Sequence, residues 1–334
     1  MVSTESLQSA IDLIEKSTDI LITTHTKPDG DACGCMVAMC DVLTSLGKQA
    51  QPLMLTPVPK WYGFLFEHKA PVLNEDITLE QLQQQQFDLV LIVDTNSRNQ
   101  LGKFAPYLEG NEKPVLIIDH HATADGLGTV DLTDSTAAAT GQVLLELFKH
   151  AEWPINRTIA EALFVAIATD TGWFRFNNTD ARVYAAGAEL TEAGANPTSL
   201  YDRLFNTFSS ERFKLMVTML NSLELHFDGR YAAQHLTCQD FKDAGATYSD
   251  SENLINECHR IESVRASTLF IELADGRIRC SLRSRGALDV SEIAGKFGGG
   301  GHKMASGTFL PGPLDHAKKL IYEEIAARKQ DLDA

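Results

Sequence analysis

The stretch Ile20-Leu-Ile-Thr-Thr24-His25-Thr-Lys-Pro-Asp29-Gly-Asp31 decides the fold of the first half of the chain. Its apolar beginning is typical of a buried parallel strand, and the proline and glycine that follow favour a tight turn. We expect a helix over residues 32–46 after this turn. In open α/β sheets, ligands bind just beyond the carboxyl ends of the strands, so the histidine and the two aspartates are predicted to lie at a ligand-binding edge.

Three further apolar runs end in the same kinds of side chain. Asp88–Val93 precedes Asp94, Val115–Ile118 precedes Asp119-His120-His121, and Leu163–Ala168 precedes Asp170. We interpret each run as a buried parallel strand, although the last one also falls within a helical pattern, Arg157–Thr169. Four such ends would bring carboxylates and imidazoles into one crevice. This set suits a pair of divalent ions, with Mn²⁺ favoured over a soft metal held by thiolates.

Strand and helix signals alternate through the first part of the chain, which predicts βαβ units and a parallel sheet. A further strand is expected over 51–55, and helical stretches over 61–66, 79–86, 136–150 and 180–193. Ala193-Gly-Ala-Asn-Pro197 interrupts this pattern. We therefore predict a metal-binding catalytic domain over 1–193, a linker or hinge over 194–222 with a helix at 209–222, and a substrate-binding domain over 223–334.

The last third of the chain has a different pattern. Strands are expected over 224–227, 231–235, 266–273 and 277–284, and helices over 251–259, 291–297 and 314–329. Asp228-Gly229 and Asp275-Gly276 are hairpin turn signals between strands. The predicted fold class is thus α/β, with an N-terminal parallel-sheet domain, a smaller C-terminal mixed α+β domain and an active-site cleft between them.

Composition limits the function. The 334 residues carry a formal net charge of −16, which argues against a protein that coats long DNA or RNA. A small phosphorylated substrate stays possible, because bound metals would invert the local charge. The sequence has neither a secretory signal nor an apolar run of membrane-spanning length, so we expect a cytoplasmic protein without membrane contact. Three of its six cysteines, Cys33, Cys35 and Cys40, fall in one predicted helix as small buried thiols.

The four motifs, in this order, resemble those of the DHH phosphoesterase family, which is named after the triplet at Asp119–His121. Ser281-Leu-Arg-Ser-Arg285 and the glycine run before His302 resemble the DHH-associated C-terminal domain with its GGGH motif. The resemblance covers about residues 15–325. It is strongest to the bacterial branch of nano-RNases and 3′-phosphoadenosine-5′-phosphate phosphatases.

The resemblance implies a role for each matched residue. One metal would be held by His25, Asp29 and Asp94, and the second by Asp31, Asp94, His120 and Asp170, so that Asp94 bridges the two ions. His121 resembles a catalytic histidine that contacts the phosphate, and Asp119 a partner that orients a ligand histidine. In the second domain, the residues implied in substrate binding are Arg283, Arg285, Gly299, Gly300, Gly301 and His302.

Two positions depart from the family pattern. Cys35 stands where the first motif often has serine, which weakens a hydroxyl contact but removes no metal ligand. Gln142 stands where relatives commonly have glutamate, and this affects one polar contact.

The resemblance implies a hydrolase that uses two divalent ions, Mn²⁺ favoured, to cleave very short RNA to mononucleotides and to act on 3′-phosphoadenosine-5′-phosphate. A homodimer through the first domain is also implied. The alternatives are a phosphodiesterase of cyclic or linear dinucleotide messengers, a pyrophosphatase or exopolyphosphatase, and a non-catalytic nucleotide sensor. The GGGH domain argues against pyrophosphate as substrate, because pyrophosphate needs no nucleobase pocket. The six filled ligand positions argue against the sensor.

Overall fold

The computed structural model describes residues 2–333 and divides into two compact units, Met1–Thr207 and Phe208–Ala334. The first unit is built on a five-stranded sheet with the order β2-β1-β3-β4-β5, in which every pairing is parallel. Its strands are β1 (Asp19–Thr23), β2 (Gln49–Leu53), β3 (Leu89–Val93), β4 (Val115–Asp119) and β5 (Val130–Thr133). All residues of β3 and β4 are buried, as expected of a parallel sheet that is covered on both faces.

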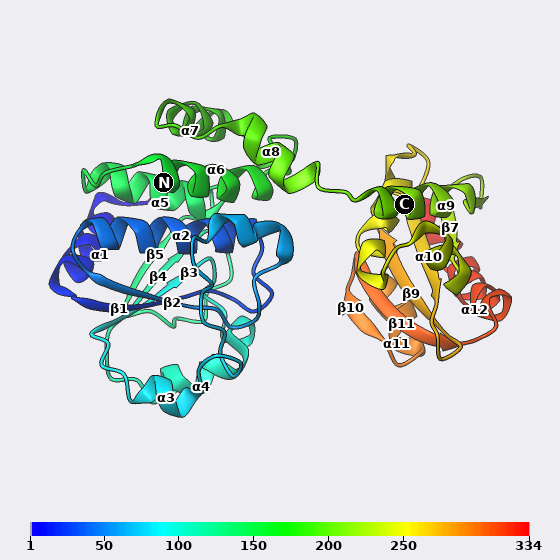
Figure 1. Cartoon of the computed structure of the whole chain (residues 1–334), viewed down its shortest axis with the longest axis horizontal. Helices are drawn as coiled ribbons and strands as arrows, with labels where there is room; N and C mark the ends of the chain where they lie inside the picture. The colour runs from blue at the N-terminus through cyan, green and yellow to red at the C-terminus, as the bar shows by residue number, and fades with distance from the viewer. Residues whose placement is uncertain (1, 334) are drawn as a thin grey trace. The chain divides into compact units, whose positions relative to one another are not determined.

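Helices cover the two faces of this sheet (Figure 1). Alternate strand residues divide between two apolar clusters, because successive side chains on a strand point to opposite faces. The larger cluster packs under α1 (Thr4–Lys16), α2 (Gly30–Ser45), α5 (Thr140–His150), α6 (Arg157–Asp170), α7 (Ala181–Glu192) and α8 (Pro197–Phe205), with η1 (Lys60–Leu65) beside it. The smaller cluster packs under α3 (Leu79–Gln83), η2 (Arg98–Phe104) and α4 (Ala105–Glu109).

The path of the chain creates a switch point between β1 and β3. From β1 the chain moves outward through α2 to β2, then crosses back to place β3 on the other side of β1. The connections that leave the carboxyl ends of β1 and β3 therefore diverge and leave a crevice, which is where ligands bind in such sheets. His25 and Asp94 follow these two strand ends.

The interpretation of Leu163–Ala168 as a strand was wrong, because this run lies inside helix α6. Residues 162–168 are all buried, since α6 packs against α2, α5, α7 and α8. A helix that is buried all round carries no polar stripe, so its apolar run cannot be distinguished from a buried strand by periodicity. The alternative helical pattern over 157–169 is confirmed.

Glycines allow α2 and α5 to approach α6 closely. A Cβ atom on Gly34 would lie 2.3 Å from the carbonyl oxygen of Ala162, and one on Gly141 would lie 2.6 Å from the Cβ of Ala166. Real Cβ atoms do not come this close to other heavy atoms. This close packing brings the first turns of α2 and α5 next to the last turns of α6, where the candidate metal ligands lie.

The second unit contains a mixed six-stranded sheet with the order β10-β11-β9-β8-β7-β6. Only β7 and β8 pair in parallel, and the remaining neighbours are antiparallel. The strands are β6 (Glu224–His226), β7 (Tyr231–Leu236), β8 (Ala266–Glu272), β9 (Arg277–Ser284), β10 (Gly300–His302) and β11 (Ala305–Pro311). The first four match the predicted strands, whereas β10 and β11 were not anticipated.

Helices cover the two faces of this sheet unequally. One face packs against α11 (Val290–Lys296), α12 (Leu314–Ala326) and α13 (Lys329–Asp333). The other face is covered over β7 and β8 by α9 (Ser210–Asn221), α10 (Cys238–Ala244) and η4 (Leu254–Arg260), and η3 (Tyr248–Ser251) packs against α9. The helix expected over 251–259 is thus replaced mainly by the 3₁₀ segment η4. Among the described residues, no helix combines the length and apolar character needed to cross a membrane.

Candidate metal centre

Three groups of potential metal ligands lie at the carboxyl edge of the first unit's sheet, and two of them contain all the ligands expected from the sequence. His25, Asp29 and Asp94 form one of these two, Asp31, His120 and Asp170 form the other, and Asp94 also lies in the third group with His120 and His121. Within each group, the candidate ligand atoms all lie within 4.8 Å of one another. Every metal ligand expected from the sequence therefore belongs to one of these groups.

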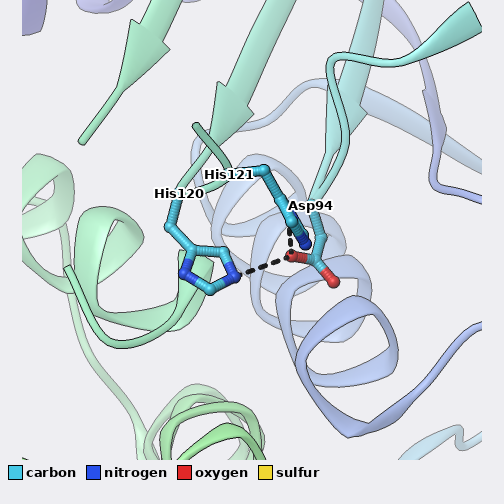
Figure 2. A group of neighbouring side chains, drawn as sticks. All are labelled: Asp94, His120 and His121. Carbon is cyan, nitrogen blue, oxygen red and sulfur yellow. Dashed lines mark ion pairs between the residues drawn. The ribbon is translucent and has the colours of Figure 1, made fainter. Parts of the chain in front are cut away.

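Asp94 links the two groups. Its Oδ2 lies 3.4 Å from Nε2 of His25, whereas its Oδ1 lies 3.8 Å from Nε2 of His120. Figure 2 shows the rings of His120 and His121 converging on the second of these oxygens. Asp94 is buried and has a positive φ of 64°, a backbone region that is unfavourable for most residues and is often found at functional sites. Each carboxylate oxygen thus faces a different group of ligands.

Backbone carbonyls orient two of the imidazoles. Nδ1 of His25 lies 2.9 Å from the carbonyl oxygen of Thr26, and Nδ1 of His120 lies 3.3 Å from that of Ala137. A carbonyl oxygen only accepts hydrogen bonds, so Nδ1 must carry the proton in both rings. Nε2 of each ring then faces the carboxylates, where its lone pair would bind a metal ion in the tautomer that metal-binding histidines adopt.

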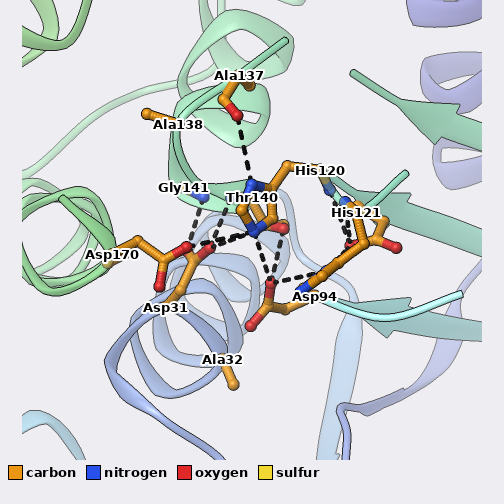
Figure 3. A network of polar contacts seen from close by, with 12 residues as sticks. Asp31, Ala32, Asp94, His120, His121, Ala137, Ala138, Thr140, Gly141 and Asp170 are labelled. Carbon is orange, nitrogen blue, oxygen red and sulfur yellow. Dashed lines mark hydrogen bonds and ion pairs between the residues drawn. The ribbon is translucent and has the colours of Figure 1, made fainter. Parts of the chain in front are cut away.

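The first turn of α5 holds Asp31 in place. The amides of Thr140 and Gly141 donate hydrogen bonds of 2.6 Å and 2.9 Å to the two oxygens of the Asp31 carboxylate (Figure 3). The residue before this helix, Ala139, has no side chain that can cap it. The buried carboxylate therefore caps α5 from another helix, and the positive end of the α5 dipole favours its ionised form.

The two histidine rings of the triplet Asp119-His120-His121 have different hydrogen-bond partners. Asp119 Oδ1 accepts a hydrogen bond of 2.8 Å from Nδ1 of His121 and also accepts the amides of His120 and His121. Asp119 therefore orients His121, and not the predicted ligand His120, whose ring is held by a carbonyl. The side chain of His121 is 44% exposed.

Bound cations would stabilise the ionised form of the buried carboxylates at this site. Burial raises the pKa of Asp31 and of Asp94 well above the usual range, and neighbouring carboxylates, including Asp170, raise both further. Oδ2 of Asp119 is also buried without a hydrogen-bond partner. The carboxylates of the site repel one another when they are ionised. Carboxylate oxygens and imidazole nitrogens together fit hard or borderline divalent ions. The donor set therefore fits the two metal ions expected from the sequence.

The nearby thiols do not belong to this donor set. Burial, followed by the charges of Asp31 and Asp94, raises the pKa of Cys35 well above its usual range. Its thiol donates a hydrogen bond of 3.2 Å to Asp31 Oδ1. Cys33 is also buried on α2, and Cys40 is half-buried on the same helix. Cys35 is therefore a neutral thiol that supports the candidate ligand Asp31 through a hydrogen bond.

The substrate-binding residues expected in the second unit differ in their hydrogen-bond partners and in their exposure. The guanidinium of Arg285 donates to the carbonyls of His259, Ile261, Glu262 and Val264, and therefore holds the segment between η4 and β8. Arg283 donates a hydrogen bond of 3.0 Å to the carbonyl of Leu282. His302 is exposed on β10.

The glycine run forms a strand edge. The Gly299 amide donates to the Ala294 carbonyl at 2.9 Å, and a Cβ atom there would lie 2.2 Å from the Gly307 carbonyl oxygen. Gly300 and Gly301 belong to β10 and pair with β11. Close approach of the β10 and β11 backbones explains why Gly299 and Gly301 carry no side chain, whereas a Cβ atom on Gly300 would meet nothing within 4 Å.

Comparison with known proteins places both units in one family. The pattern of the DHH family N-terminal domain matches residues 19–167, and that of the DHHA1 domain matches residues 228–327. A Thermus thermophilus protein named bifunctional oligoribonuclease and PAP phosphatase NrnA is 33% identical over 314 residues, which cover 92% of this chain and 89% of the relative. This chain belongs to the DHH family.

A second relative and a solved structure are also similar to this chain. The NrnA protein of Mycoplasma pneumoniae is 30% identical and covers 93% of each chain. The crystal structure of an exopolyphosphatase-related protein from Bacteroides fragilis covers 100% of this chain and 99% of its own, with a TM-score of 0.83 and 23% identity. The similarity to the Bacteroides fragilis protein supports the fold of this chain and carries no information about its substrate.

Both departures from the DHH pattern keep a polar contact. The Cys35 thiol keeps its contact with the metal-centre carboxylate, although a thiol is a weaker donor than the hydroxyl of serine. The side-chain oxygen of Gln142 accepts the amide of Ala138 at 3.0 Å, a bond that a glutamate could also accept. Thr140, which bonds two candidate ligands, was not singled out from the sequence. The expected helix over 136–150 placed Thr140 inside its first part, whereas α5 begins at Thr140.

Proposed function

We propose that this chain is a phosphodiesterase that hydrolyses very short oligoribonucleotides to mononucleotides with two divalent ions, Mn²⁺ favoured. We further propose that it removes a phosphate from 3′-phosphoadenosine-5′-phosphate. The observation that carries the proposal is the arrangement of Asp94, whose two oxygens face separate groups of ligands. Relatives at 30–33% identity over nearly the whole chain are named for these two activities.

The proposed ligands are divided around Asp94 as the sequence predicts. His25, Asp29 and Asp94 would hold one ion, and Asp31, Asp94, His120 and Asp170 the other. Bound divalent ions would polarise the phosphoryl oxygens and lower the pKa of an attacking water. The contribution of the protein is to fix the carboxylates and imidazoles before the substrate arrives, so that little reorganisation is needed during the reaction.

His121 is proposed to act on the substrate itself. Asp119 fixes the proton on Nδ1 of this ring, so Nε2 enters the reaction as a lone pair or, once protonated, as an N–H donor. Its exposure allows contact with a phosphoryl oxygen or with the oxygen that leaves. The Asp119 carboxylate would keep the ring oriented so that Nε2 can pass a proton to the leaving oxygen.

In the second unit, Arg283 and His302 are proposed to bind the terminal nucleotide. Arg285 would act mainly by holding the segment between η4 and β8, because its donors already have carbonyl partners. We also propose a cytoplasmic protein that forms a homodimer through its first unit, as expected from the sequence.

A dinucleotide messenger is the second candidate substrate. A Listeria monocytogenes protein named cyclic-di-AMP phosphodiesterase PdeA is 24% identical, and the match covers 96% of this chain but 49% of that protein. Both proposals include the linear dinucleotide pApA as a substrate. The two proposals are therefore distinguished by the activity on longer RNA and on a cyclic dinucleotide.

The test compares four substrates in the presence of Mn²⁺: pApA, an RNA of about 20 nucleotides, 3′-phosphoadenosine-5′-phosphate and cyclic di-AMP. We expect the highest kcat/KM for pApA, measurable phosphate release from 3′-phosphoadenosine-5′-phosphate, and loss of both activities with EDTA. Preferred cleavage of cyclic di-AMP would favour the messenger role. Absence of turnover on all four substrates would contradict the proposal.

A further inference from the structure

One face of the second unit's sheet carries a row of polar and basic side chains along β9. Arg277, Arg279, Ser281 and Arg283 alternate with Ile278, Cys280 and Leu282, which are buried in the core against α11 and α12. Alternation places the first four on the opposite face. On the neighbouring strand β11, Phe309 pairs with Arg279, Gly307 with Ser281, and Ala305 with Arg283.

The arginines on this face are not equally neutralised. Arg277 forms an ion pair of 2.7 Å with Asp275. Among the described side chains, which end at residue 332, no carboxylate forms an ion pair with Arg279 or Arg283. Burial lowers the pKa of Arg283, and the positive charge of Arg279 lowers it further. Two neighbouring cations without an acidic partner, in a chain of net charge −16, create a local site for an anion.

Exposed aromatic rings lie beside these charges. The guanidinium of Arg279 lies 5.2 Å from the ring centroid of Tyr248 and donates a hydrogen bond to its hydroxyl. Tyr248 is 39% exposed, and Phe309 is 52% exposed. Between Arg279 and Arg283, the surface is formed by Ser281 and Gly307, which are small. The face therefore combines positive charge, flat aromatic rings and small residues that leave room for a base. Proteins bind single-stranded nucleic acid with positive charge and aromatic rings of this kind.

The row continues the surface proposed to bind the terminal nucleotide. Ala305 pairs with both Arg283 and His302, so these side chains share the face. Arg279 lies four residues from Arg283 on the same strand, a separation of about 13 Å. We propose that Arg279, Tyr248 and Phe309 form a subsite for an additional nucleotide of a single-stranded RNA whose terminal nucleotide is bound at Arg283 and His302. This inference rests on the proposed function.

The test measures how the preference for substrate length depends on Arg279. KM is determined for pApA and pApApApA with wild type, Arg279→Ala, Arg279→Lys and Tyr248→Ala. We expect Arg279→Ala and Tyr248→Ala to raise the ratio of the KM for pApApApA to the KM for pApA about tenfold. Arg279→Lys should recover part of the loss, because lysine keeps the charge without the planar group. Arg260→Ala is the matched control, since Arg260 is an exposed arginine paired with Glu257 in η4.

Binding provides a readout that does not require turnover. The affinity of the inactive Asp94→Asn protein for fluorescent pApApApA is measured at several salt concentrations. The slope of log Kd against log salt should fall by about 0.7 in the Arg279→Ala background if one phosphate contact is lost. Equal changes for both substrate lengths, or a response like that of Arg260→Ala, would overturn the subsite while leaving the proposed function intact. Failure of the wild type to hydrolyse either RNA would instead contradict the proposed function.

Discussion

The hydroxyl of Thr140 donates a hydrogen bond of 2.9 Å to Oδ1 of Asp94, while its amide donates one of 2.6 Å to Oδ2 of Asp31. A single residue at the start of α5 therefore orients two carboxylates that come from different parts of the chain. The amide contact depends only on the backbone, whereas the hydroxyl contact depends on the side chain. Mutation of Thr140 thus separates the two effects.

Thr140→Val should weaken metal binding while keeping the fold. Valine has nearly the same shape but leaves the buried Asp94 oxygen without its donor, which costs about 1–3 kcal/mol. We expect Mn²⁺ affinity, measured by calorimetric titration, to fall about tenfold or more. Thr140→Ser keeps the hydroxyl and should bind Mn²⁺ nearly as well as the wild type. Equal affinity of the valine and serine variants would argue against a role for the hydroxyl.

Asp94→Asn should abolish Mn²⁺-dependent hydrolysis without unfolding the protein. The substitution removes the charge that the two groups of ligands share, and it also removes a buried carboxylate that is repelled by Asp29 and Asp170. In EDTA, we expect its Tm to equal or exceed that of the wild type. Added Mn²⁺ should raise the Tm of the wild type by mass action but leave that of the variant unchanged. Retained turnover would contradict the bridging role.

Gly34→Ala should destabilise the first unit because α2 and α6 are in close contact there. The new Cβ atom would lie 2.3 Å from the backbone oxygen of Ala162, so one helix must move. Overpacking of this kind costs about 1–3 kcal/mol, which corresponds to a fall in Tm of roughly 2–12 °C for a unit of this size. Gly63→Ala is the control, because its Cβ atom would meet nothing within 4 Å. Similar thermal shifts for both variants would disprove the packing argument.

Alkylation of the folded protein with iodoacetamide should label Cys238 first. Burial raises the pKa of Cys40 and Cys280 to about 12, so these groups stay neutral thiols at pH 8, and the thiolate is the reactive form. Burial also raises the pKa of Cys258 to about 12, with a smaller contribution from Glu257. Raising the pH toward 10 should increase labelling of these sites only slowly. Mass spectrometry of tryptic peptides locates the label, and complete labelling after denaturation is the control.

Residue chemistry made most of the candidate metal centre predictable. Histidines and aspartates at the ends of apolar runs are sufficient to propose a ligand set, because parallel strands end at the same edge of a sheet. The six predicted ligands lie in two groups at this edge, and one oxygen of Asp94 faces each group. The element that carries Asp170 was ambiguous, since a fully buried helix and a buried strand have similar apolar runs. The aspartate reaches the site from the end of α6.

Contacts between distant residues were not predictable. Asp31 and Thr140 are 109 residues apart in the chain, and no local pattern indicates that one caps the helix that begins at the other. Arg285 illustrates the same limit, because its sequence context suggests substrate binding while its donors are directed at carbonyls 21 to 26 residues away.

The sequence by itself determined the strand-and-helix alternation of the first unit, the identity of the candidate hard-metal donors and their order along the chain. These properties depend on local periodicity and on side-chain chemistry. The tertiary structure decided which oxygen of Asp94 faces which group, which histidine Asp119 orients, and how α5 holds Asp31. Hydrogen bonds are short and directional, so their partners are set only when packing has brought separate elements within about 3 Å of one another.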